Sequence, residues 1–444
     1  MTIAAKADAS ERGAKKPAPA EKKVRVGLCG FGTVGRSVAK LLSLDADGPL
    51  RLTVICNRGI ERKKVDWAPK HVRWTENVDD ALGPDVDVFV ELIGGLEPAG
   101  EWIRRALRAG KSVVTANKQL IAERGPELLK LAQETGQRIE FGASVAGGIP
   151  AIIGIQEGLA GDRLYKIAGI LNGTCNYILT EMEANGASFE AALREAQKLG
   201  YAEADPTSDV EGYDARAKLV ILAQAGLSVA VRSEQIPCRT VSSIEAIDFV
   251  YARELHCTIR QISSAQKDAA SKNAGGLRLF AGVQPALVRL QSLTAHVQGS
   301  KNLVTATGEF AGQMVFSGYG AGGDPTAVAV VSDLHAIANG SGAAQRVRAL
   351  ATPDSVSGDF TVPHYLRFVV KDRPGILAEL AAVLARYGIG IDAVLQKPDH
   401  PPSNLPFVMT LEACNSAVLQ RALEEIARMD FHTKPPLCLP IFLD

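Results

Sequence analysis

Two charged residues on one predicted helix face are the clearest sign of chemistry in this sequence. Asp214 and Lys218 are four residues apart in the segment GYAEADPTSDVEGYDARAK at 200–218. A helix turns 100° per residue, so the pair shares a stripe with the apolar Ile221 and Leu222. An ionised carboxylate and ammonium leave water only when they are paired or line a cleft. The pattern therefore indicates either an ordinary surface ion pair or a polar site that can move protons.

A glycine-rich turn follows the first apolar segment of the chain. Residues 24–42, VRVGLCGFGTVGRSVAKLL, read as a strand, a turn with the spacing Gly30-x-Gly32-x-x-Gly35, and a helix. Gly30 allows a tight turn, Gly32 lets backbone amides approach a pyrophosphate, and Gly35 lets the helix pack closely on the strand. Because the motif lies between a strand and a helix, it predicts a dinucleotide site.

Two further positions concern the choice of cofactor and its surroundings. The predicted strand 52–56 ends at Asn57 and Arg58, where an NAD site would place an acid against the ribose 2′-hydroxyl. Arg58 and the basic residues after it suit a 2′-phosphate, which favours NADP over NAD, although a solvated basic turn is the alternative. Lys118 follows the predicted strand 112–116 and is either a contact of the nicotinamide or substrate, or a solvated lysine.

Strands that alternate with helices must position these residues. Besides the strands already named, we expect a buried strand at 86–92 and helices at 101–109 and 125–135. Such alternation predicts a doubly wound parallel sheet, which binds ligands beyond the carboxyl ends of its strands. The glycine-rich segment 141–150 should close this domain.

The expected fold class is α/β: a Rossmann-type doubly wound nucleotide domain, a mixed α+β substrate and dimerisation domain, and a ferredoxin-like domain. The last follows from the order strand, helix, strand, strand, helix, strand between 365 and 443. The predicted boundaries are a disordered tail at 1–22, the nucleotide domain at 23–150 with a return helix at 322–340, the substrate domain at 151–321, a linker at 341–361, and a regulatory domain at 362–444.

Composition excludes several classes of protein. The 49 basic residues balance 49 acidic ones without a basic block, so nucleic acid is not an expected partner. The seven cysteines form no C-x-x-C pair or Cys/His cluster, which argues for a reducing compartment and against a zinc site. No apolar run has membrane-spanning length, so we expect a cytoplasmic protein without a membrane partner.

Six segments taken together resemble homoserine dehydrogenase, and their order and spacing are more specific than any one of them: GFGTVGRSVAKLL at 30–42, TANK at 115–118, SVAGGIP at 144–150, LNGTCNYIL at 171–179, GYAEADPTSDVEGYDARAK at 200–218 and GAGGDPTA at 320–327. The resemblance runs from about Val24 to Asn339 and continues into a segment similar to ACT domains. It implies NAD(P)-dependent interconversion of L-homoserine and L-aspartate 4-semialdehyde, a step toward threonine and methionine.

The resemblance also implies roles for single residues. Lys218 matches the family's acid/base lysine, and an alcohol oxidation does require a proton acceptor within hydrogen-bond reach. Asp214 and Glu203 match carboxylates that hold the substrate's amino group, and Lys118 matches a lysine near the cofactor and substrate. Contacts with the cofactor are expected at Gly30, Phe31, Gly32, Thr33, Val34, Gly35, Arg58, Lys118, Gly200, Gly320 and Gly322.

A structural cation is a further implication of the resemblance. Family members bind a monovalent cation, usually Na⁺, through backbone carbonyls that match Val145, Gly147 and Ile149, often with an acidic residue just upstream. This chain has Gly142 at the upstream position. A hard cation prefers a charged oxygen ligand, so the site lacks one expected contribution.

Regulation, assembly and two alternative functions complete the expectations. The turn Asp372 to Gly375 resembles the ligand loop of ACT domains, which suggests L-threonine as a feedback effector, and we expect a homodimer or homotetramer. One alternative is a phosphorylating semialdehyde dehydrogenase with Cys175 as the nucleophile. The other is a sensor of nucleotide and amino acid without catalysis. We expect Cys175 to be a small buried packing residue, because unpaired cysteine is usually buried.

Overall fold

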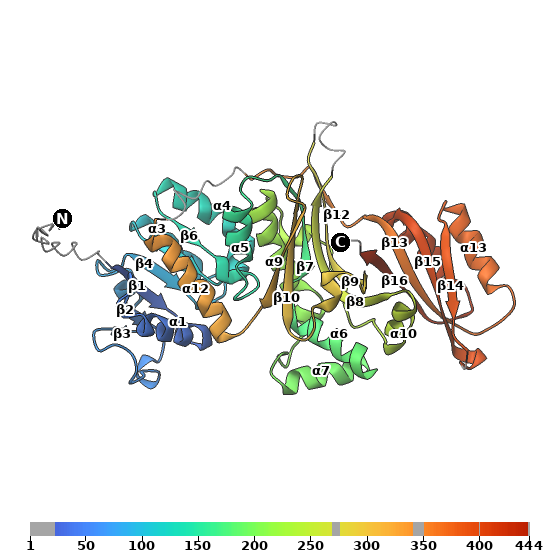
Figure 1. Cartoon of the computed structure of the whole chain (residues 1–444), viewed down its shortest axis with the longest axis horizontal. Coiled ribbons are helices and arrows are strands. Elements are labelled where there is room, and N and C mark those ends of the chain that lie inside the picture. The colour runs from blue at the N-terminus through green and yellow to red at the C-terminus, as the bar shows by residue number, and fades with distance from the viewer. Residues whose placement is uncertain (1–22, 269–275, 341–349, 399, 443–444) are drawn as a thin grey trace, which may run out of the picture.

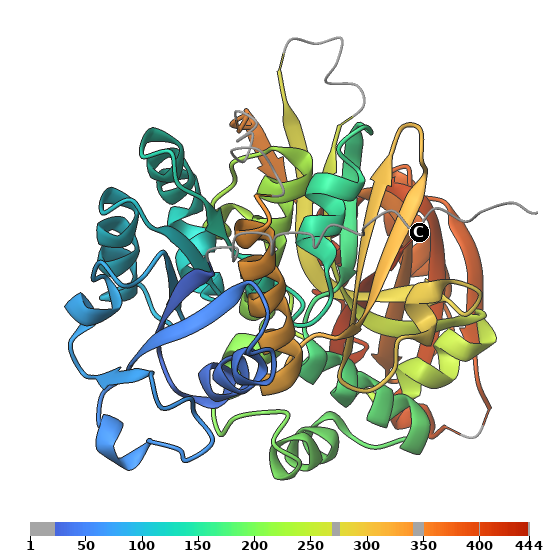
Figure 2. The same cartoon turned by 60° about the vertical axis from the view of Figure 1, so that its left-hand side comes forward.

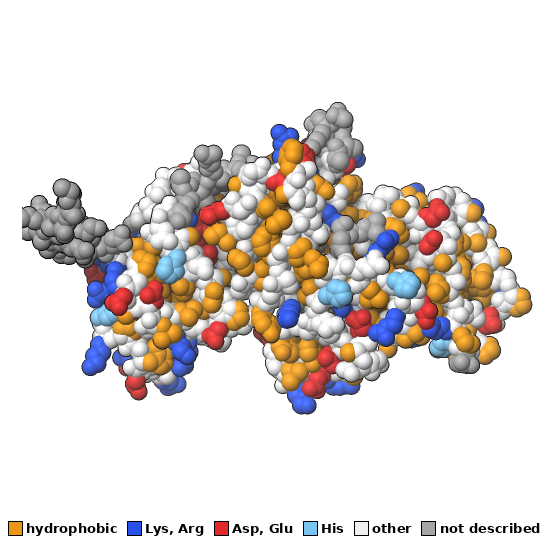
Figure 3. Space-filling model, viewed as in Figure 1, with side chains coloured by type: hydrophobic (Ala, Val, Ile, Leu, Met, Phe, Trp, Pro, Cys, Tyr) orange, Lys and Arg blue, Asp and Glu red, His pale blue; other side chains and the backbone are white. Residues whose placement is uncertain are grey.

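The computed structural model describes residues 23–268, 276–340, 350–398 and 400–442 (Figure 1). The predicted tail at 1–22 lies outside the described residues. The chain forms two sheets, one of six strands and one of ten. In the described parts of the chain, every helix is too short or too polar to cross a bilayer. Figure 3 shows charged side chains of both signs interspersed over one face of the molecule.

The first sheet confirms the predicted doubly wound domain. Its strand order is β3-β2-β1-β4-β5-β6, and every neighbouring pair is parallel. The strands are β1 (Val24–Cys29), β2 (Leu50–Cys56), β3 (Arg73–Thr75), β4 (Val88–Glu91), β5 (Ser112–Thr115) and β6 (Ile139–Glu140). The helices between them are α1 (Thr33–Leu44), α2 (Val78–Ala81), α3 (Ala99–Arg108) and α4 (Lys118–Glu134).

The start of α4 differs from the predicted helix at 125–135. The helix begins at Lys118, because the side chain of Asn117 accepts a hydrogen bond from the backbone N–H of Leu120 at 3.1 Å and caps it. Pro126 lies inside the helix. The predicted helix at 125–135 was therefore wrong in its start and covers only the C-terminal part of α4.

A helix from late in the chain completes the first domain. Helix α12 (Gly323–Ala338) packs on α1, where Val330 and Leu334 share a core cluster with Val38 and Leu42. Figures 1 and 2 both show this orange helix beside the blue N-terminal elements. The turn that precedes α12 therefore lies at the start of α1: a Cβ atom at Gly323 would be 2.8 Å from the side chain of Thr33.

The second sheet begins with antiparallel strands, β7 (Leu164–Ile170), β8 (Cys257–Lys267), β9 (Arg278–Arg289), β10 (Lys301–Gly308) and β11 (Gln313–Tyr319). Its helices are α5 (Ala151–Ile153), α6 (Gly173–Asn185), α7 (Phe189–Lys198), α8 (Thr207–Val210), α9 (Tyr213–Leu222) and α10 (Ala246–Glu254). Part of the predicted linker joins this sheet, because β12 (Ser355–Ser357) pairs in parallel with β9. Residues 341–349 of that linker lie outside the described residues.

The C-terminal segment has the predicted βαββαβ order: β13 (Thr361–Val370), α13 (Ile376–Arg386), β14 (Ile391–Gln396), β15 (Leu405–Asn415), α14 (Ser416–Ile426) and β16 (His432–Phe442). We call this segment the C-terminal module. Its strand order is β16-β13-β15-β14, as in ferredoxin-like folds. Strand β16 also pairs with β9, at Ile441 and Phe442, so the module extends the central sheet.

A buried cluster of charges joins the module to α10. The Nη1 atom of Arg367 lies 2.6 Å from Glu245 Oε1, and its Nε atom lies 2.8 Å from Asp248 Oδ1. Tyr365 donates its hydroxyl proton to Asp248 Oδ1 at 2.8 Å. Asp248 is completely buried, and burial raises the pKa of its carboxyl group, which Arg367 opposes. The cluster fixes the module against the start of α10.

Arg367→Ala should lower the free energy of unfolding by about 3–5 kcal/mol, because it leaves the Asp248 carboxylate buried without a cation. The matched control is Lys397→Ala, which removes an ion pair with Glu254 whose side chains are 34% and 53% exposed. That change should cost less than about 1 kcal/mol. Urea denaturation measures both values, and equal losses would contradict a structural role for the buried cluster.

Candidate active site

Polar residues gather at the carboxyl ends of the parallel strands. Thr115 donates its hydroxyl proton to Glu91 Oε2 at 2.6 Å, and both side chains are completely buried at the ends of β5 and β4. The other oxygen of Glu91 accepts the backbone N–H groups of Ile93 and Gly94 at 2.8 and 2.9 Å. These bonds fix the strand ends from which α4 starts, and Lys118 is the first residue of that helix.

Helix α9 places Asp214 and Lys218 beside the start of α4, where Lys118 lies. Its N-cap is Gly212, with φ of 82°, where a Cβ atom would lie 2.9 Å from Val283. Asp214 and Lys218 are only 6% and 9% exposed. The pair is therefore buried, which rules out the interpretation as an ordinary surface ion pair.

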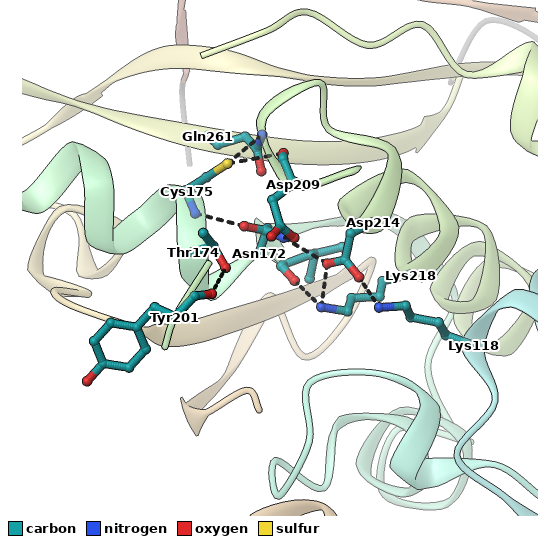
Figure 4. A network of polar contacts seen from close by, with 10 residues as sticks. Lys118, Asn172, Thr174, Cys175, Tyr201, Asp209, Asp214, Lys218 and Gln261 are labelled. Carbon is teal, nitrogen blue, oxygen red and sulfur yellow. Dashed lines mark hydrogen bonds and ion pairs between the residues drawn. The ribbon is translucent and has the colours of Figure 1, made fainter. Parts of the chain in front are cut away.

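Asp214 links two lysines that are far apart in the sequence (Figure 4). Lys218 Nζ donates to Asp214 Oδ2 at 2.7 Å and to the carbonyl oxygen of Leu171 at 2.8 Å. Lys118 Nζ donates to the other oxygen of Asp214. Asn172, at the N-cap of α6, donates to Asp214 Oδ2 at 2.9 Å and to Asp209 Oδ1 at 2.6 Å. We call Lys118, Asn172, Asp209, Asp214 and Lys218 the polar cluster.

The two acids of the polar cluster titrate differently. Burial by itself would raise the pKa of Asp214, but the ammonium groups of Lys218 and Lys118 outweigh it and hold the pKa well below its usual range. Burial raises the pKa of Asp209, and the hydrogen bond from Asn172 only partly offsets it. Asp214 therefore stays ionised and holds two cations in place. Asp209 and Asn172 were not predicted from the sequence.

Cys175 is a packing residue, as expected. Its side chain is completely buried in α6, and its thiol lies 3.1 Å from the carbonyl oxygen of Asp209. Gln261 donates to the sulfur at 3.5 Å. Burial raises the pKa of the thiol well above its ordinary value. A nucleophilic thiolate requires the opposite shift, so this environment does not suit the cysteine-dependent alternative.

The three fingerprint glycines meet different surroundings. Gly30 has φ of 105°, and a Cβ atom there would lie 2.6 Å from the backbone of Leu92. A Cβ atom at Gly35 would collide with the carbonyl oxygen of Gly30, whereas one at Gly32 would meet nothing within 4 Å. The chain itself thus requires Gly30 and Gly35, while Gly32 borders open space at the start of α1. This is the space that a pyrophosphate needs.

Other residues expected to contact the cofactor lie around the fingerprint. Asn57, at the end of β2, accepts the backbone N–H of Phe31 at 2.8 Å, and the exposed Arg58 follows it. Thr33 and Val34 are in the first turn of α1. Gly322 is the N-cap of α12. Gly320 lies against Gly147, because a Cβ atom at Gly147 would be 2.7 Å from the backbone carbonyl carbon of Gly320.

Two predicted residues, Gly200 and Glu203, belong to the segment between α7 and α8. Gly200 ends the segment of α7 with φ of 79°, and Glu203 is exposed on the loop between α7 and α8. That loop is tethered, because Thr174 donates its hydroxyl proton to the carbonyl oxygen of Tyr201 at 2.7 Å. Within the described residues, Asp214 is the acid whose hydrogen bond to Lys218 is seen, at 2.7 Å.

A glycine fingerprint at the carboxyl end of a parallel strand, together with a buried lysine–carboxylate cluster in the same chain, is typical of a nicotinamide-dependent oxidoreductase. Three family models match this chain: the NAD-binding domain of homoserine dehydrogenase at residues 30–142, homoserine dehydrogenase at 150–335, and the ACT domain at 364–431. The chain belongs to the homoserine dehydrogenase family.

Individual relatives support this membership over nearly the whole chain. A homoserine dehydrogenase of Bacillus subtilis is 39% identical over 395 residues, which cover 85% of this chain and 88% of the relative. The crystal structure of a homoserine dehydrogenase from Thiobacillus denitrificans has a TM-score of 0.85 at 34% identity and covers 95% of this chain and 98% of its own. A hyperthermophilic archaeal homoserine dehydrogenase mutant in complex with NADPH has a TM-score of 0.59 at 25% identity, covering 71% and 97%.

Proposed function

We propose that this chain interconverts L-homoserine and L-aspartate 4-semialdehyde and that Lys218 exchanges the proton with the substrate oxygen. The observation that carries the proposal is the buried pair of Lys218 and Asp214 at the edge of a nucleotide-binding sheet. Family membership supports the reaction, and the burial of the pair supports its use in proton transfer, since nearly dry groups interact strongly.

The hydrogen bonds of Lys218 support its role. A lysine ammonium has three N–H donors, and Lys218 directs two of them to Asp214 and Leu171. The third remains for the oxygen of a substrate. When bound, the nicotinamide supplies the hydride acceptor or donor. Asp214, with Glu203 on the neighbouring loop, supplies negative charge for the ammonium group of the substrate, and Lys118 holds Asp214 from the cofactor side.

The proposed cofactor is NADP, with NAD as the alternative. Its pyrophosphate would lie against the amides of residues 30–35, and Arg58 would meet a 2′-phosphate. The NADPH-bound archaeal relative supports the same class of cofactor. Lys118, Gly200, Gly320 and Gly322 complete the proposed cofactor contacts.

Steady-state assays test this function most simply. Purified protein should reduce nicotinamide only with L-homoserine, faster with NADP than with NAD, and without any need for phosphate. A phosphate requirement or inactivation by thiol alkylation would favour the cysteine-dependent alternative. Absence of turnover with homoserine under both cofactors, and of any phosphate-dependent reaction, would support the sensor interpretation.

A structural Na⁺ ion is part of the proposal, held by the carbonyls of Val145, Gly147 and Ile149. Position 142 offers no acid, but the carboxyl group of Asp333 in α12 lies against it and accepts the backbone N–H groups of Gly142 and Ala143. Within the described residues, its Oδ2 atom is buried and has no hydrogen-bond partner. A hard cation suits such an oxygen, so Asp333 fits the missing acidic ligand.

Asp333→Asn should change the response of stability to pH and to Na⁺. Burial, and then the charge of Glu140, raises the pKa of Asp333 from 3.8 to about 8. The contribution of this group to stability is therefore complete below pH 3.8 and is lost as the pH rises through 8. Relative to the natural chain, the variant should become more stable as the pH rises over this interval.

Melting temperatures in NaCl and in tetramethylammonium chloride at pH 8 test the cation directly. Na⁺ should raise the melting temperature of the natural chain by about 2–4 °C per kcal/mol of binding free energy, and should leave Asp333→Asn nearly unchanged. An equal rise in both proteins would show that Asp333 is not a ligand.

Feedback regulation by L-threonine and assembly as a homodimer or homotetramer are also proposed. Support for regulation comes from the turn at 372–375, where Gly375 has φ of 98° and Arg373 pairs with Glu379 at 2.6 Å. Repeating the assay with and without threonine tests regulation, and light scattering of the purified chain tests assembly.

A further inference from the structure

One amide side chain touches both acids of the polar cluster. Asn172 lies between β7 and α6 and is the N-cap of α6, where its Oδ1 atom accepts the backbone N–H of Cys175 at 2.8 Å. Asn172 is only 3% exposed. Its oxygen thus serves the start of the helix, and its amide nitrogen is left for partners on other elements.

The amide nitrogen of Asn172 is shared between two carboxylates (Figure 4). It donates to Asp209 Oδ1 at 2.6 Å and to Asp214 Oδ2 at 2.9 Å. A side-chain amide has two N–H protons, so each carboxylate receives one and neither proton remains for a substrate. Asp209 belongs to α8 and Asp214 to α9, so Asn172 ties both of these helices to the start of α6.

The turn that contains Asn172 also holds Lys218. The Lys218 ammonium donates to the carbonyl oxygen of Leu171, the residue before Asn172, at 2.8 Å. It donates as well to Asp214 Oδ2 at 2.7 Å, and this is the oxygen that Asn172 contacts. The direction of the ammonium is therefore set twice from this turn, once by Leu171 and once through Asp214.

The amide of Asn172 also lies between two like charges. Burial is the largest cause that raises the pKa of Asp209, and the charge of Asp214 adds to it, whereas the hydrogen bond from Asn172 lowers this pKa. A hydrogen bond to a carboxylate favours its charged form. Without the amide, the two carboxylates would repel each other with no donor between them, and Asp214 would lose one of the contacts that fix its orientation.

We propose that Asn172 is a positioning residue for the reaction: it holds the carboxylates of Asp209 and Asp214, and through Asp214 it keeps the Lys218 ammonium directed at the substrate oxygen. This role rests on the proposed function, because it takes Lys218 as the group that exchanges the proton. Asn172 does not donate to the substrate, since both of its amide protons are engaged. Capping of α6 is a separate, structural role, so the test must keep the cap and remove the bridge.

Asn172→Ser keeps the cap, because serine caps helices about as well as asparagine. It removes the bridge, because one hydroxyl proton cannot serve two carboxylates. The kcat for homoserine oxidation should fall about 10–100-fold, the usual effect of losing a hydrogen bond to a charged group. Affinity for NADPH, measured by fluorescence titration, should not change. In a Lys218→Ala background the same change should cause almost no further loss, because Asn172 acts through Lys218.

Asn172→Asp tests the bridge through pH. Aspartate has the shape of asparagine and also caps helices, but it places a third carboxyl group between Asp209 and Asp214. Like charges raise the pKa of this new group. It still donates one hydrogen bond while it is protonated, and it only repels its neighbours once it is ionised. The kcat relative to the natural chain should therefore fall as the pH rises from about 5 to 8.

The titratable groups that the contacts place around position 172 come from four helices. They are Asp209 from α8, Asp214 and Lys218 from α9, Lys118 from α4, and Cys175 from α6. Lys218 and Lys118 hold the pKa of Asp214 low, so this acid stays ionised. Burial raises the pKa of the Cys175 thiol, which stays neutral. The new carboxyl group and Asp209 are thus the groups whose protonation decides the pH response.

The matched controls are Asn415→Ser and Asn415→Asp. Asn415 is the N-cap of α14 in the C-terminal module, and its Oδ1 atom accepts the backbone N–H groups of Ala417 and Val418 at 3.0 and 3.3 Å. It therefore caps a helix as Asn172 does, without a link to the polar cluster. The same two changes at this cap should leave kcat unchanged at every pH.

Several results would overturn the positioning role of Asn172. They are a natural kcat in Asn172→Ser, a loss in Asn172→Asp that is the same at every pH, and a full further loss in the Lys218→Ala background. Unfolding of both variants in a thermal melt would also overturn it, because Asn172 would then be a structural residue. Failure of the proposed function is distinguishable, since Lys218→Ala itself would then keep near-normal turnover.

Discussion

Lys218→Ala should lower kcat for homoserine oxidation by about 10²–10⁴-fold, the usual contribution of a positioned acid or base. The variant loses the N–H donors that now meet Asp214 and the carbonyl oxygen of Leu171. Affinity for the cofactor should change little, because the fingerprint lies on another element. Stopped-time assays of kcat and fluorescence titration of NADPH measure the two effects separately.

The matched control for this prediction is Lys198→Ala. Lys198 pairs with Glu195 on α7, and its side chain is 76% exposed. Its replacement should leave both kcat and cofactor affinity near the natural values, since exposed pairs contribute little. Near-normal turnover in Lys218→Ala, with the control also normal, would remove this lysine from the reaction.

Gly32→Ala should weaken binding of NADP about a hundredfold while the chain keeps its stability. An added Cβ atom at this position meets no protein atom within 4 Å, so folding is not opposed. The methyl group would instead occupy the space against the start of α1 that the pyrophosphate needs. Equilibrium binding and a thermal melt of the variant without cofactor measure the two quantities.

Gly35→Ala is the contrasting variant. A Cβ atom there collides with the carbonyl oxygen of Gly30, so this change should lower the melting temperature as well as cofactor affinity. If Gly32→Ala binds NADP normally, the fingerprint turn does not hold the pyrophosphate. If Gly32→Ala and Gly35→Ala destabilise the chain equally, a side chain at position 32 must collide with the protein, which would contradict the open space next to Gly32.

Local sequence patterns predicted the architecture well. The fingerprint and the βαββαβ order follow from residues that are near one another in the chain, and the strongly apolar segment at 322–340 predicted a helix that packs on the first domain. The predicted start of the helix at 125 was wrong, because α4 begins at Lys118 and continues through Pro126. The capping bond of Asn117 to Leu120 decides the boundary instead, and only the structure reveals it.

The candidate site was only partly predictable. The spacing of Asp214 and Lys218 indicates a shared helix face, but nothing in the sequence shows that Lys118, 96 residues earlier, reaches the same carboxylate. Asn172 and Asp209 join the polar cluster through contacts between separate helices. Glu91 could have been predicted as a site residue, because it is an acid at the end of a buried apolar strand. Tertiary packing brings these residues together.

A crystal structure with L-homoserine and a nicotinamide cofactor bound would test the proton role of Lys218 most directly. We predict that the distance from Lys218 Nζ to the substrate hydroxyl oxygen is within about 3.2 Å, while the contact with Asp214 remains. A hydroxyl oxygen held by another side chain, with Lys218 Nζ beyond hydrogen-bond reach, would contradict the assignment.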